Sequence, residues 1–315
     1  MNFKNLKLIS GDASFRKFYK GKKGLIVHSI KEKKSNLLIY NSINEILIKN
    51  KIKAPKLISQ NYKKNYIEIE YLGKNSVYKK IMNNKKKRFI YYKKIIFLLK
   101  KIQKIKNKKI ITFLNTHYTI PTYSRNLLFK EACLFTKWYL PKIVAKKKQS
   151  RLKIKFHRVF KKILNNLKGD NNTFVHRDFH VSNLLLFKNN IGVIDSQDAL
   201  YGNRAYDLAS LIDDVRIRTS FEEKKKIYNE FIKINKNINH IKFKNDFEIL
   251  SVLRNFKIIG IFTRLSQRDK KKQYLKLIPY AWKMIEMRVF KNEKFSEIKN
   301  LIDLNFPKQQ RIIKK

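Results

Sequence analysis

Cysteine and long apolar runs are scarce in this 315-residue chain, and each scarcity excludes a class of protein. The one cysteine, Cys133, lies in an apolar segment, so the chain can form neither an internal disulfide nor a cysteine-based metal site. No apolar run approaches the roughly 18 residues of a membrane span, and the N-terminus shows no apolar core of a secretory signal. We therefore expect a soluble, cytoplasmic protein without a membrane span.

Acidic residues are also few. The chain has 23 Asp and Glu against 74 Lys and Arg, a formal net charge of +51. Such a charge favours phosphate-rich partners, namely nucleic acid, anionic lipid or nucleotide. The lysines are spread along the whole length and accompany heavy use of Asn and Ile, as an A/T-rich genome would impose. We expect any nucleic-acid binding to be nonspecific and most lysine runs to be solvated faces.

The hydrophobic pattern changes near residue 73. With 43% hydrophobic residues, the chain can bury a core as one large domain or as two lobes. Before residue 73 the pattern is β-rich around one helical segment from Ser35, with strands expected at 6–9, 15–19, 25–30, 56–59 and 66–72. Beyond it, helices are expected at 76–107, 123–145, 151–168, 206–218, 221–234, 244–264 and 272–290. We predict an α+β fold with a small, mainly β lobe at 1–73, a larger helical lobe at 74–315, and the active site between them.

One stretch of the second lobe is β in character, FVHRDFHVSNLLLFKNNIGVIDSQDA at 174–199. Its two apolar runs are joined by a three-residue turn centred on Asn189, which predicts a tight hairpin. Asn183 and Asp195 are each six residues from Asn189, so antiparallel pairing predicts that they lie side by side at the open end. Asp178 precedes Asn183 by five residues, in a loop that begins at the same end.

These polar groups suit metal-assisted phosphoryl transfer. Asn and Asp offer the hard oxygens that Mg²⁺ takes when phosphate supplies its other ligands, and a third carboxylate can orient a hydroxyl and accept its proton. His176, Arg177, Asp178 and Asn183 fit the H-R-D-x-x-x-x-N catalytic loop. We predict Asp178 as the catalytic base and Asn183 and Asp195 as Mg²⁺ ligands, with ATP as phosphoryl donor. The plainer interpretation, that both aspartates cap strand ends, does not require the symmetric register.

A likeness to one family extends from this stretch, in the run HRDFHVSNLLLFKNNIGVIDSQDALYGNRAYDLASLIDDVR. The run resembles the aminoglycoside phosphotransferase family, small-molecule kinases with a two-lobed protein-kinase-like fold. The chain is most similar to the branch of anomeric N-acetylmuramate/N-acetylglucosamine kinases of cell-wall recycling. Matches to that branch cover nearly the whole chain, with the GDAS-like opening at 11–19, the IDFQDA-x-x-G run at 194–202 and a C-terminal segment at 253–280. The resemblance implies transfer of the ATP γ-phosphoryl group to the anomeric hydroxyl of an N-acetylated amino sugar.

The sequence departs from the expected pattern in three ways. Ser196 replaces an aromatic residue, and Asn203 replaces a proline. The strand on which protein kinases place the phosphate-gripping lysine offers His28, and the next helix has Glu45 one turn later than their glutamate. The lysine–glutamate clamp is therefore unassigned, although the branch that the chain resembles also tends to lack that lysine.

Two segments are predicted to bind the nucleotide, a turn near the N-terminus and an interlobe hinge. With the clamp unassigned, the SGDAS turn becomes the phosphate cradle, through its backbone N–H groups. A single glycine there is, on its own, more typical of a plain hairpin turn. The segment before Gly73 lies where an interlobe hinge would present backbone groups to adenine. The predicted cofactor-binding residues are Gly11, Asp12, Ala13, Ser14, Glu70 and Leu72.

Three further residues are candidates for the acceptor side. Asp198 would bind a second metal or the substrate. Arg254 and Arg264, ten residues apart on a helix, would pair with a carboxylate such as the lactyl group of N-acetylmuramate, although solvated arginines are the plainer interpretation. The expected partner is a small-molecule sugar, and no oligomeric state is predicted.

Two other functions remain open. The first is a kinase of another small alcohol or of an aminoglycoside. The second is a noncatalytic polyanion-binding protein on a kinase-like scaffold. The presence of Asp178, Asn183 and Asp195 argues against the second, because a noncatalytic scaffold has no need of all three.

Overall fold

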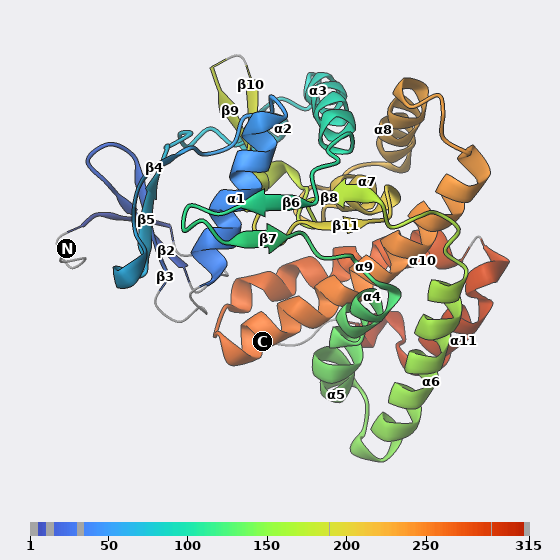
Figure 1. The fold of residues 1–315 in the computed structure, drawn as a ribbon. Helices are drawn as coiled ribbons and strands as arrows, with labels where there is room; N and C mark the ends of the chain where they lie inside the picture. Colours follow the sequence, from blue (N-terminus) through green and yellow to red (C-terminus); the bar gives the residue numbers. More distant parts are fainter. Residues whose placement is uncertain (1–5, 11–15, 30–34, 189, 291, 312–315) are drawn as a thin grey trace. The chain divides into compact units, whose positions relative to one another are not determined.

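The computed structural model describes residues 6–10, 16–29, 35–188, 190–290 and 292–311 (Figure 1). The chain forms two compact units, each built from two separate segments. Unit 1 comprises Met1–Pro121 and Thr173–Tyr201, and unit 2 comprises Thr122–Asn172 and Gly202–Lys315. No helix of the described residues has both the length and the apolarity to cross a membrane.

Unit 1 begins with a five-stranded antiparallel sheet of order β1-β2-β3-β5-β4. Its strands are β1 (Leu8–Ser10), β2 (Arg16–Lys20), β3 (Leu25–Ser29), β4 (Leu57–Asn61) and β5 (Tyr66–Ile69). Each lies within one of the five predicted β-rich runs or overlaps it, so these predictions are confirmed. Gly73, where the smaller lobe was expected to end, has a φ of 91°, a backbone conformation that favours glycine. The lobe boundary there stays a prediction.

The helix α1 (Ser35–Lys49) packs on this sheet. Leu37 and Tyr40, one helical turn apart, are buried in one cluster with Val27 of β3 and Ile67 of β5. The face of α1 that carries Leu37 and Tyr40 therefore lies against the strands (Figure 1). This packing anchors the polar residues of α1 that reach the candidate site.

The rest of unit 1 departs from the predicted pattern in two places. The helix expected at 76–107 is divided into α2 (Val77–Asn83) and α3 (Arg88–Ile102), because the Asn84 side chain accepts a hydrogen bond from the Lys87 N–H at 3.0 Å and starts a new turn. A hairpin of three-residue strands that was not predicted follows. The remaining strands of unit 1 are β6 (Lys109–Ile111), β7 (His117–Thr119), β8 (Thr173–Val175), β9 (Leu184–Phe187), β10 (Asn190–Val193) and β11 (Leu200–Gly202), which ends one residue into unit 2.

The β9–β10 hairpin forms as predicted, but its register is shifted by one residue. Asn190 already belongs to β10 and pairs with the last residue of β9, so the turn holds two residues and not three. Lys188 has a φ of 52°, the left-handed conformation that two-residue hairpin turns need. The carbonyl of Asn183 consequently accepts a hydrogen bond from the N–H of Ile194 at 3.0 Å, and Asp195 lies one residue beyond. The prediction that Asn183 and Asp195 pair across the hairpin is therefore wrong.

Unit 2 is helical. A π-helix at Phe135–Tyr139 connects its first two helices. Its α-helices are α4 (Arg125–Ala132), α5 (Leu140–Ile143), α6 (Lys146–Asn165), α7 (Ala205–Ile212), α8 (Phe221–Ile234), α9 (His240–Arg268), α10 (Ile278–Val289) and α11 (Ser296–Asn305). All but α11 were expected, with shifted bounds for most of them. The bounds of α8 agree with the prediction, because Ser220 and Glu223 form a reciprocal capping box at its start.

Aromatic side chains form the core of unit 2. The Phe135 ring, on the π-helix, lies at the centre of the group, with ring centroids between 4.8 and 5.6 Å away on Tyr139, Phe156, Phe256, Trp282 and Phe306. The Trp282 indole N–H donates to the Tyr139 hydroxyl at 3.0 Å, and that hydroxyl donates to the Arg311 carbonyl at 2.8 Å, so the polar atoms of these two rings are satisfied. Gly260 of α9 lies against the start of the π-helix, where a Cβ would come within 2.3 Å of the Leu134 carbonyl carbon.

Candidate active site

The loop after β8 carries the predicted catalytic base. It begins with His176, which is fully buried and whose Nε2 donates to the carbonyl of Ile194 at 3.1 Å. Burial lowers the pKa of His176, against the opposing effect of Asp178 and Asp195. The imidazole is therefore neutral near pH 7, and it ties the start of the loop to the end of β10.

Asn183 closes the same loop. The carbonyl of Asp178 accepts two hydrogen bonds, one from the His180 N–H and one from the Asn183 side-chain amide, both at 3.0 Å. Asn183 thus fixes the backbone that presents Asp178. Because its amide nitrogen is used in this way, the side-chain oxygen is the atom that Asn183 can offer to a cation.

Asp195 follows β10 in a left-handed conformation, with a φ of 63°. Its side chain is 41% exposed, yet the surrounding protein removes enough water to raise its pKa, and the nearby Asp178 raises that pKa further. The structure therefore brings the predicted base and the predicted metal ligand close enough for their charges to interact. Gln197 steadies Asp195, since its amide nitrogen donates to Asp195 at 3.0 Å and to Asp198 at 3.3 Å.

A cation that the sequence analysis did not find lies beside Asp195. Arg16, the first residue of β2, is 3% exposed, and its Nη2 is 3.4 Å from Asp195 Oδ1. The guanidinium lies over the Tyr40 ring, 5.4 Å from its centroid. The sequence signal was its place directly after the GDASF segment, on the strand that follows the predicted phosphate cradle.

The segment after Asp195 is tied to α1. Ser196, at the position where the family has an aromatic residue, is fully buried and donates to Asn44 Oδ1 at 2.7 Å. Glu45, the glutamate nearest the expected clamp position, accepts a hydrogen bond from Asn41 at 2.8 Å within the same helix. Asn44 and Ser196 therefore connect α1 to the segment that carries Asp195.

The predicted nucleotide-binding residues are described only in part. Gly11, Asp12, Ala13 and Ser14 lie outside the described residues. The Glu70 carboxylate pairs with Lys53 Nζ at 2.5 Å, and its N–H donates to the Lys56 carbonyl at 2.8 Å. Leu72 is 3% exposed, and its Cδ1 lies 2.8 Å from the position that a Cβ on Gly192 would occupy. Both residues therefore have structural contacts, and their part in adenine binding stays a prediction.

The three residues predicted to bind the acceptor sugar belong to different units. Asp198 lies in unit 1 with the catalytic loop, where its carboxylate is 3.5 Å from Arg177 Nη1. Arg254 and Arg264 lie on α9 in unit 2, and ten residues of helix separate them by about 15 Å along the axis. Arg254 is 5% exposed, whereas burial lowers the pKa of the less deeply buried Arg264. Their roles in acceptor binding stay predictions.

The donor set fits Mg²⁺ bound together with phosphate. Within the described part of the chain, no group of three or more His, Cys, Asp or Glu side chains is arranged to hold a metal by itself. One amide oxygen from Asn183 and one carboxylate from Asp195 are all-oxygen ligands, and Mg²⁺ commonly takes one or two protein ligands and completes its shell with phosphate and water. A cation there would also offset the carboxylate repulsion that raises the pKa of Asp195.

Comparison with known proteins identifies the family. Residues 5–230 match the family described as "Phosphotransferase enzyme family". The N-acetylmuramate/N-acetylglucosamine kinase of Pseudomonas aeruginosa is 24% identical over 302 residues, which cover 93% of this chain and 86% of that protein.

Solved structures agree on the fold. Choline kinase LicA from Streptococcus pneumoniae has a TM-score of 0.58 at 13% identity, covering 95% of this chain and 93% of that one. ADP-bound aminoglycoside phosphotransferase APH(2″)-Ib has a TM-score of 0.59 at 13% identity, covering 92% and 94%. These likenesses, with the small antiparallel sheet and the larger helical part, confirm the predicted α+β, protein-kinase-like fold. Because the family match also spans more than two thirds of the sequence, the chain belongs to the phosphotransferase enzyme family.

Proposed function

We propose that the protein is an ATP-dependent sugar kinase that phosphorylates the anomeric hydroxyl of N-acetylmuramate or N-acetylglucosamine. Membership of the phosphotransferase enzyme family supports the reaction class. The name of the P. aeruginosa relative supports the acceptor, and the ADP-bound fold neighbour supports a nucleotide donor. The observation that carries the proposal is the convergence of Asp178, Asn183, Asp195 and Arg16 within unit 1.

Asp178 would act on the acceptor. His176 and Asn183 hold both ends of its loop, so the carboxylate is presented by a fixed backbone. A carboxylate in this position orients the attacking hydroxyl and accepts its proton late in a loose transition state. An anomeric hydroxyl suits such a base, because the ring oxygen withdraws charge and makes it more acidic than the other sugar hydroxyls.

Asn183 and Asp195 would hold Mg²⁺. A metal held by these two residues would supply positive charge that offsets the negative charge developing on the phosphate during transfer. Arg16 would then do what the clamp lysine does in protein kinases. We expect its guanidinium to orient Asp195 and to bind phosphate oxygens, for which the planar fork of Arg is well suited.

The acceptor-side residues extend this proposal. Asp198 would contact a sugar hydroxyl, and Arg254 or Arg264 would bind the lactyl carboxylate that N-acetylmuramate has and N-acetylglucosamine lacks. An Arg264→Gln variant is then expected to raise KM for N-acetylmuramate about tenfold, as for loss of one charged hydrogen bond, and to leave KM for N-acetylglucosamine unchanged. Equal changes for both sugars would remove Arg264 from the carboxylate site.

The test of the function is a panel of sugars and other alcohols incubated with Mg-ATP, with ADP release followed and the product isolated. We expect release with the two N-acetylated amino sugars and a product that reducing-sugar reagents no longer detect. Phosphorus NMR should show coupling to the anomeric proton. A phosphate on the 6-position, or preferential phosphorylation of an aminoglycoside or a small amino alcohol, would contradict the proposed acceptor.

A further inference from the structure

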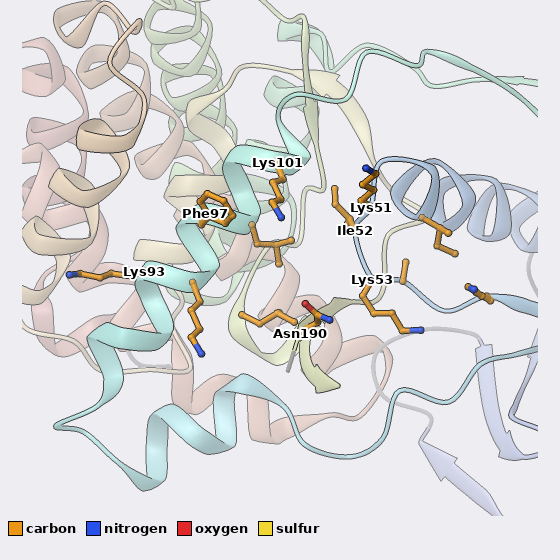
Figure 2. A pocket seen from close by; sticks show the side chains of 13 residues that line it. Lys51, Ile52, Lys53, Lys93, Phe97, Lys101 and Asn190 are labelled. Atoms are coloured by element: carbon orange, nitrogen blue, oxygen red, sulfur yellow. The ribbon is translucent and has the colours of Figure 1, made fainter. Parts of the chain in front are cut away.

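A cavity of about 670 Å³ opens in unit 1 between the end of α1, the middle of α3 and the start of β10. Figure 2 shows Phe97 and Lys101 of α3 on one side, Lys51 and Ile52 across from them, and Asn190 lower in the view beside Lys53. Its volume is within the range of pockets that bind small molecules. Asp178, Asn183 and Asp195 are not among its described lining residues, so it is separate from the candidate active site.

The charged residues that line this cavity, within the described part of the chain, are all lysines. None of its described lining residues is acidic. One of its lysines is compensated, since Lys53 pairs with Glu70 at 2.5 Å and its Nζ lies 4.4 Å from the centre of the Phe187 ring. The other five form no ion pair with a described residue. The lining lysines are Lys51, Lys53, Lys56, Lys93, Lys94 and Lys101.

The floor of the cavity is apolar. Ile52 is 2% exposed and Leu98 is 9% exposed, and both are part of the core. Phe97 contrasts with them, because 56% of it is exposed although it is an aromatic residue on a helix whose neighbouring residues are buried. The Lys101 Nζ lies 4.9 Å from the centre of the Phe97 ring. The site therefore offers a flat apolar surface next to several cations.

We propose that this cavity binds a phosphorylated small molecule with a flat aromatic body, the chemistry of a nucleoside diphosphate or triphosphate. Base stacking on Phe97 would cover its exposed ring, and phosphate groups would offset the charge of Lys51, Lys101 and their neighbours. The Asn190 side chain adds one donor and one acceptor for the edge of a base. The size of the cavity suits one such molecule, whereas a nucleic-acid strand would need an extended groove.

The test is a titration of the full-length protein with ADP at about 0.15 M salt, where exposed long-range charge effects are screened. With Mg²⁺ present we expect two ADP per chain, one at the active site and one in the cavity. With the metal chelated, the cavity site is expected to persist. Pyrophosphate, which lacks the aromatic body, should compete for it only weakly.

Variants at exposed positions assign the site. Phe97→Ala is expected to weaken metal-independent ADP binding at least about fivefold, because base stacking is lost. Lys101→Gln is expected to weaken it about tenfold, because one charge-assisted contact is lost. Lys147→Gln and Lys225→Gln, which remove exposed lysines in unit 2, serve as matched controls.

Unchanged ADP binding in both pocket variants, or the absence of metal-independent binding in the parent protein, would overturn the proposal. Tighter binding of a short single-stranded RNA than of ADP, insensitive to Phe97→Ala, would overturn it as well. None of these outcomes depends on the identity of the acceptor, so the cavity and the sugar kinase activity are tested separately.

Discussion

Asp195 is the residue at which the opposing charges of the site meet. Burial and Asp178 raise its pKa, and Arg16 is the first of the groups that lower it. A carboxylate must be deprotonated to bind Mg²⁺, so affinity for the metal falls as the pH falls through the pKa of Asp195. Because that pKa is raised, the loss occurs at a higher pH than for an ordinary aspartate.

Replacing Arg16 tests this balance. Without the guanidinium, the pKa of Asp195 rises further, so the acidic limb of the pH profile of kcat/KM for Mg-ATP should move to higher pH in Arg16→Gln. We also expect kcat/KM to fall about 10²–10³-fold, as for the loss of one charge-stabilising donor. Arg16→Lys keeps the charge and serves as control. An acidic limb that does not move would contradict the assigned partnership.

Substitutions of Asp178 and Asp195 are expected to have different effects on Mg-ATP binding and on phosphoryl transfer. Asp178→Asn should still bind Mg-ATP and lose about 10²–10⁴ in transfer rate, because only the proposed proton acceptor is removed. Asp195→Asn should lose both Mg-ATP binding and transfer, because the proposed metal ligand is removed. Calorimetry with Mg-ATP, beside single-turnover rates, separates the two, and transfer at the parental rate in Asp178→Asn would disprove its role as base.

Local spacing was enough to predict that Asp178 and Asn183 lie close together. Asp178 and Asn183 are five residues apart and are joined by a hydrogen bond within one loop, so their proximity follows from the chain itself. Arg16 could not be found in this way, because 179 residues separate it from Asp195 and only the folded sheet brings the two together. Ser196 was noted as a departure, but its partner Asn44 was not, for the same reason.

At the scale of elements, the sequence predicted best those helices that begin with capping residues and those strands that are bounded by turn residues. The capping box of α8 is one such signal. The ten-residue α11 was missed because a helix of that length depends on packing, here of Ile298 and Ile302, more than on its own propensity. The hairpin register was missed because Lys188-Asn189-Asn190 suits a two-residue or a three-residue turn, and the sequence does not decide between them.

The contact between α9 and the π-helix supports a prediction for unit 2. In Gly260→Ala the new Cβ would meet the backbone around Leu134, which cannot move as a side-chain end could. We expect a loss of stability of about 1–3 kcal/mol, as for other overpacked sites. Denaturant unfolding measures it, with Lys244→Ala on the exposed face of α9 as control. A Gly260→Ala protein as stable as the parent would show that this close approach is not required.

At the scale of the whole molecule, the net charge of +51 opposes compactness, because like charges repel. Raising salt from about 10 mM to about 150 mM shortens the screening length from about 30 Å to about 8 Å. We therefore expect Tm to rise by about 2–4 °C over this range, equivalent to roughly 1 kcal/mol. Sodium and potassium chloride should act alike, since screening does not depend on the cation. A Tm that stays constant or falls would show that the charges are already compensated in the folded protein.

The two-segment composition of each unit has a consequence for synthesis on the ribosome. The first segment of unit 1 ends at Pro121, but the strands and the loop that complete it run from Thr173 to Tyr201. At 5–20 residues per second, the ribosome needs about 4–16 s to add the intervening and completing residues. During that interval the nascent chain contains the strands of the sheet without the loop that carries Asp178, and the first part of unit 2 is synthesised before unit 1 is complete. A chain that stalls after Pro121 and before Asp195 therefore contains all five strands of the sheet but lacks at least one of Asp178, Asn183 and Asp195.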